Sequence, residues 1–334
     1  MLLSNRNRLL IRSVFLATAV WALPGTVDAQ KKTKLTEHYV LGRIRVFYAN
    51  KGISAVEQTD ADKSGVPDHV EDVAKQVWAA HQLFCKVLKF PDPFESERYP
   101  KLTCIEIGLR DREEKGGGNG TAYEKSQRAR PIPEGKSNDR TLVMVVATQV
   151  DPVKGVTPSH EFFHLIQYSA TYFKNPWYLE GQARWAEHSL AKDGLGGVKY
   201  SPRGPWPQSQ RNLKQLFGMK YAAEYVLWNP IAARTDRAGI LSSRRLGKEL
   251  TTLRYSDGSR VLKDNLLKGP TIMRDILIEL GKMDDIAFKE LGYESWSEAN
   301  QKSPANCPYI YQAIMDVLRK HARPIGRFKA APRK

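Results

Sequence analysis

Cysteine and long apolar runs are both scarce in this sequence, and each scarcity excludes a class of protein. The chain of 334 residues has three cysteines, at positions 85, 104 and 307, and no Cys-x-x-Cys spacing. A thiolate zinc cluster and the common dithiol redox motif are therefore not indicated. Apart from the apolar run at 14–23, no segment approaches the length that crosses a bilayer. We therefore expect no transmembrane segment in the mature chain.

The N-terminus has the layout of a secretory signal peptide. Three arginines precede the apolar run at 14–23, and Val27 and Ala29 stand where a signal peptidase requires small residues. The run is too short to anchor the chain in a membrane. Residues 1–29 are therefore expected to be a signal peptide cleaved after Ala29, and the mature protein to be secreted or periplasmic.

In an oxidising compartment, three cysteines predict one disulfide and one spare thiol. Cys85 and Cys104 are the nearest pair along the chain and are therefore the expected bridge. Cys307 would then be the spare thiol.

Acidic residues are too few to balance the basic ones. The chain has 52 Lys and Arg against 36 Asp and Glu, a net charge of +16, of which +14 remains after residues 1–29 are removed. This balance favours anionic partners such as cell-surface polymers, and residues 321–334 read as a basic tail. No nucleic-acid motif accompanies the charge, so nucleic acid is not an expected partner.

Strand patterns dominate the first half of the sequence and helical patterns the second. Strands are predicted at 38–49, 102–110 and 142–148, a helix at 70–88, and loops at 115–120 and 124–140. Further helices are predicted at 208–228, 271–280, 286–291 and 309–320. The fold class is therefore α+β, with a strand-containing N-terminal lobe (30–150) and a mainly helical C-terminal lobe (151–320). Strand 142–148 is expected at a sheet edge, where an extended peptide can pair with it.

The most informative motif is His160-Glu161-Phe-Phe-His164. Residues four apart share one face of a helix, so both imidazoles can reach one metal ion, with Glu161 beside them to handle the proton of a bound water. Thr157 is expected to cap this helix, with Pro158 at its first position. The alternative is a helix with ordinary buried histidines.

A catalytic zinc site takes three protein ligands and keeps a fourth position for water. The third ligand is expected from a second helix that Pro176 opens, and Glu180, Glu187 and His188 are all candidates. Helix geometry does not choose among them. If Glu187 is not a ligand, it is expected to orient a ligating histidine.

The pairing of His-Glu-Phe-Phe-His with the downstream Trp-Tyr-Leu-Glu-Gly-Gln-Ala-Arg-Trp-Ala-Glu resembles the gluzincin clan of zinc metallopeptidases, and more narrowly its secreted bacterial members. The match is specific over residues 157–188. It implies a zincin-like two-lobed domain in which His160, His164 and Glu180 bind Zn²⁺. It also implies an oxyanion donor downstream, for which Tyr221 and Tyr225 are candidates and Tyr221 is preferred.

Residues 60–71 have the spacing of a calcium loop, with glycine at its sixth position. The candidate ligands are Asp60, Asp62, Ser64, the Val66 carbonyl, Asp68 and Glu71. Pro67 departs from the paired EF-hand pattern, and no helix is predicted before Asp60. The alternative is a turn in which Asp68 caps the following helix.

These observations predict a secreted zinc endopeptidase that cleaves peptide or protein substrates, with Glu161 as general base and Ca²⁺ as a second candidate cofactor. No Gly-x-Met-Glu-Asn element is present, so an aminopeptidase has no support from the sequence. Two rivals remain. One is another gluzincin hydrolase, such as an aminopeptidase or a cell-wall amidase; the other is a noncatalytic calcium-dependent module that binds anionic surfaces.

Overall fold

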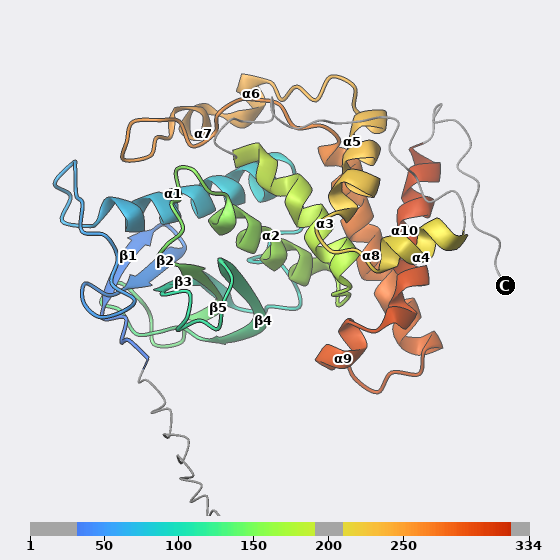
Figure 1. Ribbon diagram of the computed structural model, residues 1–334, viewed down its shortest axis with the longest axis horizontal. Helices are drawn as coiled ribbons and strands as arrows, with labels where there is room; N and C mark the ends of the chain where they lie inside the picture. The colour runs from blue at the N-terminus through green and yellow to red at the C-terminus, as the bar shows by residue number, and fades with distance from the viewer. Residues whose placement is uncertain (1–31, 191–209, 322–334) are drawn as a thin grey trace, which may run out of the picture. The chain divides into compact units, whose positions relative to one another are not determined.

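The computed structural model describes residues 32–190 and 210–321 (Figure 1). The predicted signal peptide, residues 1–29, lies outside the described residues, as does nearly all of the predicted basic tail. Among the described residues, no helix has the length and apolar character needed to span a membrane.

The described strands form one mixed sheet in the order β1-β2-β3-β5-β4. They are β1 Glu37–Leu41, β2 Ile44–Tyr48, β3 Leu102–Arg110, β4 Gly120–Arg128 and β5 Arg140–Ala147. Strands β2, β3 and β5 run parallel, whereas β1 and β4 are antiparallel to their neighbours at the two edges. The central strands are rich in buried apolar residues, as expected of strands covered by other elements.

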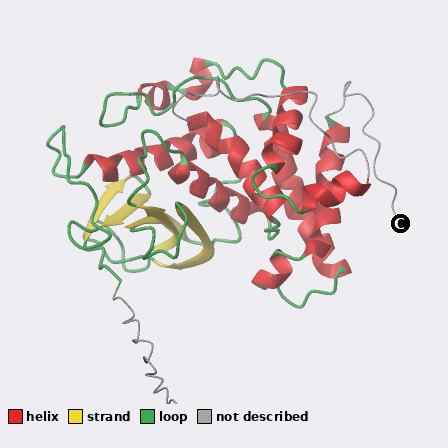
Figure 2. Cartoon of the chain, in the orientation of Figure 1, coloured by secondary structure: helices red, strands yellow, loops and turns green. Residues whose placement is uncertain are grey.

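Helices pack on the sheet and extend beyond it (Figures 1 and 2). The longer ones are α1 Asp68–His81, α2 Thr157–Ala170, α3 Pro176–Glu187, α4 Gln210–Phe217, α8 Pro270–Glu290 and α10 Cys307–Lys320. The shorter ones are α5 Asn229–Thr235, α6 Ser243–Leu246, α7 Lys248–Thr252 and α9 Glu298–Gln301. Two π-helical segments, η1 Gln82–Val87 and η4 Glu224–Trp228, continue α1 and precede α5. Helices α1 and α2 contact the sheet, and α3 packs beside α2.

The α+β class is confirmed, and several predicted elements need correction. The strand predicted at 38–49 is the hairpin β1–β2, because Gly42 adopts a positive φ of 62° and turns the chain. Part of the loop predicted at 124–140 belongs to β4. Strand β5 lies between β3 and β4 and is therefore not an edge strand; the edge beside it is β4.

In the second half of the chain, the helices are interrupted or joined at other places than predicted. The helix predicted at 208–228 is interrupted after α4, and Gly218 follows its last residue. The helices predicted at 271–280 and 286–291 are one helix, α8, whose buried positions continue through Asp284 to Ala287. The helix predicted at 309–320 is present as α10.

The predicted disulfide is wrong, because all three cysteines are free and buried. Cys85 lies on η1, with its sulfur 3.9 Å from the Pro91 carbonyl oxygen. Cys104 lies on β3, with its sulfur 3.8 Å from the Arg140 carbonyl oxygen. Nearness along the chain does not bring two Cβ atoms to bonding distance when a helix and a strand separate them.

Candidate metal centre

Helices α2 and α3 carry the predicted motif; Pro176 is the first residue of α3, whereas Pro158 is the second residue of α2 and not the first as predicted. Helix α2 begins at Thr157 itself, and the capping position falls on Val156 without a side-chain hydrogen bond. The prediction that Thr157 caps the helix is therefore wrong by one residue. Pro176 opens α3 as predicted, since a missing N–H does no harm in the first turn.

Three predicted ligands converge between these helices. The Nε2 atom of His160 lies 3.2 Å from Oε2 of Glu180, and the Nε2 atom of His164 lies 3.6 Å from the same oxygen. All three donor atoms lie within 4.8 Å of one another. The imidazoles meet edge to face, with 4.7 Å between their centroids. One nitrogen from each ring and one carboxylate oxygen therefore face a common point.

The other two candidates for the third position have different partners. Glu187 contacts the far side of His160, with its Oε2 atom 2.7 Å from Nδ1. His188 pairs instead with the buried carboxylate of Glu224, 2.5 Å away. Of the three candidates, Glu180 is therefore the one whose carboxylate lies at the point that both Nε2 atoms face.

Both ring nitrogens that face away from this point are held by side chains. Glu187 fixes Nδ1 of His160 and is itself 3.1 Å from Nη1 of Arg184. The Nδ1 atom of His164 lies 2.8 Å from Oε1 of Gln167, whose amide nitrogen donates to a backbone carbonyl of α3. Such contacts fix the tautomer and the ring orientation and leave each Nε2 free to bind a metal. Glu187 lies where the sequence predicts a residue that orients a ligating histidine, whereas Gln167 was not predicted.

Burial and ion pairing shift the pKa values of the site in opposite directions. Burial alone would lower the pKa of His160, but hydrogen bonds with Glu180 and Glu187 outweigh it and raise the pKa to about 10. Burial would raise the pKa of Glu180, yet the contacts with both histidines hold it well below its usual range. Burial raises the pKa of Glu161. The Glu180 carboxylate is thus kept charged beside the imidazoles, whereas Glu161 is biased toward holding a proton.

These residues line a cavity of about 770 Å³. Glu161 lies on one wall and the start of β4 on another. A Cβ atom added to Gly120 would come within 2.5 Å of Glu161 Cγ, so glycine permits the close approach of β4 to this carboxylate. The remaining lining residues include Gly118, Asn119, Thr121, Ala122, Tyr168, Leu179, Lys220 and Tyr221.

Tyr221 lines the cavity and is 48% exposed, with the Lys220 ammonium 4.5 Å from its ring centroid. Tyr225 is exposed and is not among the lining residues. Tyr168, which the sequence analysis overlooked, also lines the cavity, and its ring stacks on His164 with 6.0 Å between centroids. Burial raises the pKa of Tyr168, so its hydroxyl keeps its proton. Its spacing of four residues from His164 was the available signal.

In the predicted calcium loop, carboxylate oxygens of Asp60, Asp62 and Asp68 lie within 4.8 Å of one another. The backbone N–H groups of Ser64 and Gly65 donate to Asp60, and the Ser64 hydroxyl lies 3.3 Å from the Val66 carbonyl oxygen. Glu71 is not part of this cluster; its Oε2 atom pairs with Nζ of Lys75 at 2.9 Å. Asp68 is the first residue of α1, and Pro67 occupies the capping position.

Two imidazole nitrogens and one carboxylate oxygen form the donor set typical of a catalytic zinc site. A carboxylate beside such a site can accept a proton from water, and a neutral tyrosine can donate a hydrogen bond to a developing oxyanion. No family model matches the chain, and neither do any curated proteins or solved structures.

Proposed function

We propose that this protein is a secreted, zinc-dependent endopeptidase with a zincin-like two-lobed catalytic domain. One observation carries the proposal: His160, His164 and Glu180 direct three donor atoms to one point in a cavity where Glu161 stands beside them. The resemblance of residues 157–188 to secreted gluzincins supports the same assignment.

The residues fit zinc in donor type, charge and orientation. A metal that displaces the extra proton of His160 would be held by two neutral imidazoles and one carboxylate, with a fourth position left for water or substrate. The carboxylate of Glu180, whose pKa is held low, keeps a negative charge beside the two imidazoles, and that charge favours a divalent cation. The contacts at both Nδ1 atoms orient the histidines before any ion arrives.

When bound, zinc supplies a Lewis acid that brings the pKa of a coordinated water toward 7 and polarises a carbonyl. Residues of the chain would transfer the protons and stabilise the oxyanion. A cation bound beside Glu161 would favour its charged form, and the carboxylate would accept the proton of the attacking water and pass it to the leaving amine. Tyr221 and Tyr168 both line the cavity, and we propose Tyr221 as the donor to the oxyanion, with Tyr168 as the structural alternative.

The edge strand β4 offers a place for the substrate backbone. Its inner side pairs with β5, and its first residues, Gly120 to Ala122, line the cavity. An extended peptide adding to this edge would gain main-chain hydrogen bonds and pass over Glu161. This proposal replaces the predicted role of β5, and it suits cleavage within a chain because an edge strand does not require a free terminus.

The test is metal analysis combined with peptide cleavage by the mature chain, residues 30–334. We expect at least one zinc per chain and cleavage of peptides blocked at both termini, both lost after treatment with a chelator. Cleavage that requires a free N-terminus would favour an aminopeptidase, and release of cell-wall fragments alone would favour an amidase. Calcium without zinc, and no hydrolysis, would favour the noncatalytic surface-binding module.

We also propose that the loop at Asp60, Asp62 and Asp68 binds Ca²⁺ weakly, as extracellular sites do.

Replacing Gly120 with alanine should lower the rate of hydrolysis while zinc content is unchanged. The new methyl group would displace the Glu161 side chain, because it cannot share its space, and a misplacement of about 1 Å can cost roughly 10²-fold in rate. Gly108→Ala is the matched control: it lies on β3, where the added Cβ would meet ordinary contacts of 3.4 Å or more. Equal kinetics for both variants would show that β4 does not constrain Glu161.

A further inference from the structure

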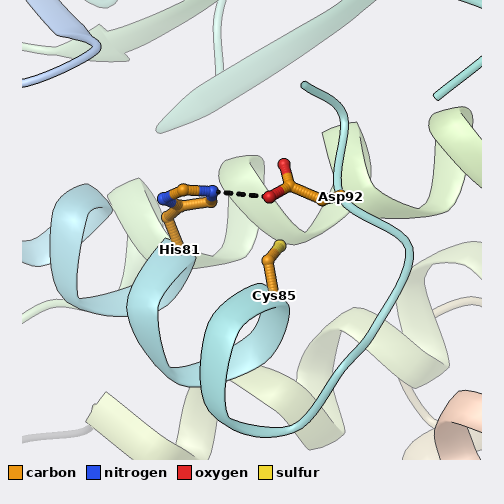
Figure 3. Close-up of side chains that lie close together, drawn as sticks. All are labelled: His81, Cys85 and Asp92. Carbon is orange, nitrogen blue, oxygen red and sulfur yellow. Dashed lines mark hydrogen bonds and ion pairs between the residues drawn. The ribbon is translucent and has the colours of Figure 1, made fainter. Parts of the chain in front are cut away.

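A second group of metal-binding side chains lies away from the cavity, where α1 ends (Figure 3). His81 is the last residue of α1, Cys85 follows on η1, and Asp92 lies on the loop beyond. Their donor atoms lie within 4.8 Å of one another. All three residues are buried, with exposures of 7%, 4% and 7%. Figure 3 shows the three side chains directed toward one another.

The hydrogen bonds of the group fix Asp92 in place and leave the sulfur with one weak contact. His81 Nε2 lies 3.0 Å from Asp92 Oδ2, and the Phe94 N–H donates to Oδ1 at 3.0 Å. Lys86 Nζ lies 2.6 Å from Oδ2 and 2.8 Å from Oε1 of Glu95. The Cys85 sulfur lies 3.9 Å from the Pro91 carbonyl oxygen. A nitrogen, a sulfur and an oxygen donor therefore share one buried space.

This mixed donor set selects a class of ion. Thiolate is a poor ligand for calcium or magnesium, whereas zinc and similar divalent transition metals accept sulfur, imidazole and carboxylate together. The three residues are also close together in the sequence: His81 and Cys85 are four residues apart, and Asp92 follows Cys85 by seven residues. The π-helical backbone at Cys85 is rare in proteins and is frequent at functional sites.

Burial argues against a reactive thiol. It raises the pKa of Cys85 well above its usual range, which disfavours the free thiolate that nucleophilic or redox chemistry needs. A coordinated thiol, by contrast, loses its proton to solvent when the metal binds. Thiolate and carboxylate would then balance the two charges of the ion, while Lys86 and Glu95 balance each other.

We propose that His81, Cys85 and Asp92 form a structural site for zinc or a similar divalent transition metal. His81 binds through Nε2 and Cys85 as thiolate, while Lys86 keeps its hydrogen bond to Asp92 from outside the coordination shell. A water from the neighbouring cavity, which Asp92 lines, completes the tetrahedron. A metal bound at this site would link the loop after η1 to the end of α1.

This position connects the site to the active-site helix. The His81 ring packs edge to face on Phe162, with 5.9 Å between centroids, and Phe162 directly follows Glu161. The His81 ring also contacts Phe94, with 5.3 Å between the ring centroids. A metal that fixes His81 would therefore also stabilise the packing of α1 against α2.

Cobalt substitution tests the proposal independently of hydrolysis. Metal-free mature protein reloaded with Co²⁺ should bind two equivalents and show a thiolate-to-cobalt charge-transfer band in the near ultraviolet. None of the described residues lining the first cavity is a cysteine, so that band reports the second site alone. His164→Ala should lose one equivalent and keep the band, and Cys85→Ser should lose the other equivalent together with the band.

Cys104→Ser is the matched control, since Cys104 is also a buried free cysteine; both equivalents and the band should remain. Asp92→Asn provides a second variant if Cys85→Ser fails to fold, and it should weaken cobalt binding and shift the band. Absence of the band in folded wild-type protein would overturn the proposal, as would its persistence in folded Cys85→Ser. Failure of this test with hydrolysis intact leaves the proposed peptidase untouched.

Discussion

Replacing Glu161 with glutamine is expected to reduce hydrolysis about 10²–10⁴-fold while zinc content stays at the wild-type level. Glutamine has nearly the same shape but cannot accept the proton of the attacking water. The Glu161 carboxylate is not one of the three groups that converge on the proposed metal position, so metal affinity should survive. The measurement is kcat/KM on a blocked peptide, together with the zinc-to-protein ratio of the same preparation.

Glu113→Gln is a suitable control for this experiment, because it makes the same chemical change at an exposed glutamate that does not line the cavity. It should retain wild-type kinetics. A fully active Glu161→Gln variant would mean that another group accepts the proton. Loss of zinc in that variant would instead place Glu161 among the ligands.

The helices that carry the proposed centre could be predicted because their signals are local. His160 and His164 share a face at a spacing of four residues, and prolines mark the openings of α2 and α3. Strand β3 was predicted with its correct bounds for a similar reason, since its β-branched and apolar residues are buried in the middle of the sheet.

Strand β4 could not be recognised from its residues. It lies at a sheet edge and has a polar sequence of partly buried and exposed residues, and charged side chains are common on edge strands because they oppose aggregation. Its sequence therefore predicts a loop over part of the strand, and β5 is wrongly predicted as the edge strand. The order in which the strands pair decides which strand lies at the edge, and local periodicity carries no information about that order.

Contacts between distant segments explain the remaining differences. The contacts of Glu180, Glu187 and His188 depend on how α3 packs against α2 and on residues far along the chain, such as Glu224, which pairs with His188. The partner of each cysteine likewise depends on tertiary structure. Cys85 lies beside His81 and Asp92, and a Cys-x-x-Cys pattern does not cover such a mixed group of ligands.

Replacing Glu180 with glutamine is expected to remove one equivalent of zinc and to reduce hydrolysis to background. Its Oε2 atom lies 3.2 Å from Nε2 of His160 and 3.6 Å from Nε2 of His164, and a neutral amide there is a poor substitute for the anionic ligand. The loss of charge also removes the partner of Lys220, which lies 3.4 Å from Oε1. The uncompensated ammonium would then repel an arriving cation. Zinc titration and kcat/KM on a blocked peptide measure both effects.

The same substitution at Glu187 is the matched control, because that carboxylate contacts the same histidine from its other side, 2.7 Å from Nδ1. Loss of an orienting partner costs about 10–100-fold in metal affinity or activity, so Glu187→Gln should bind a full equivalent and regain activity when zinc is in excess. Glu180→Gln should not be rescued in this way. The reverse result, with Glu187→Gln empty and Glu180→Gln loaded, would make Glu187 the third ligand and would require α3 to turn relative to α2 when the ion binds.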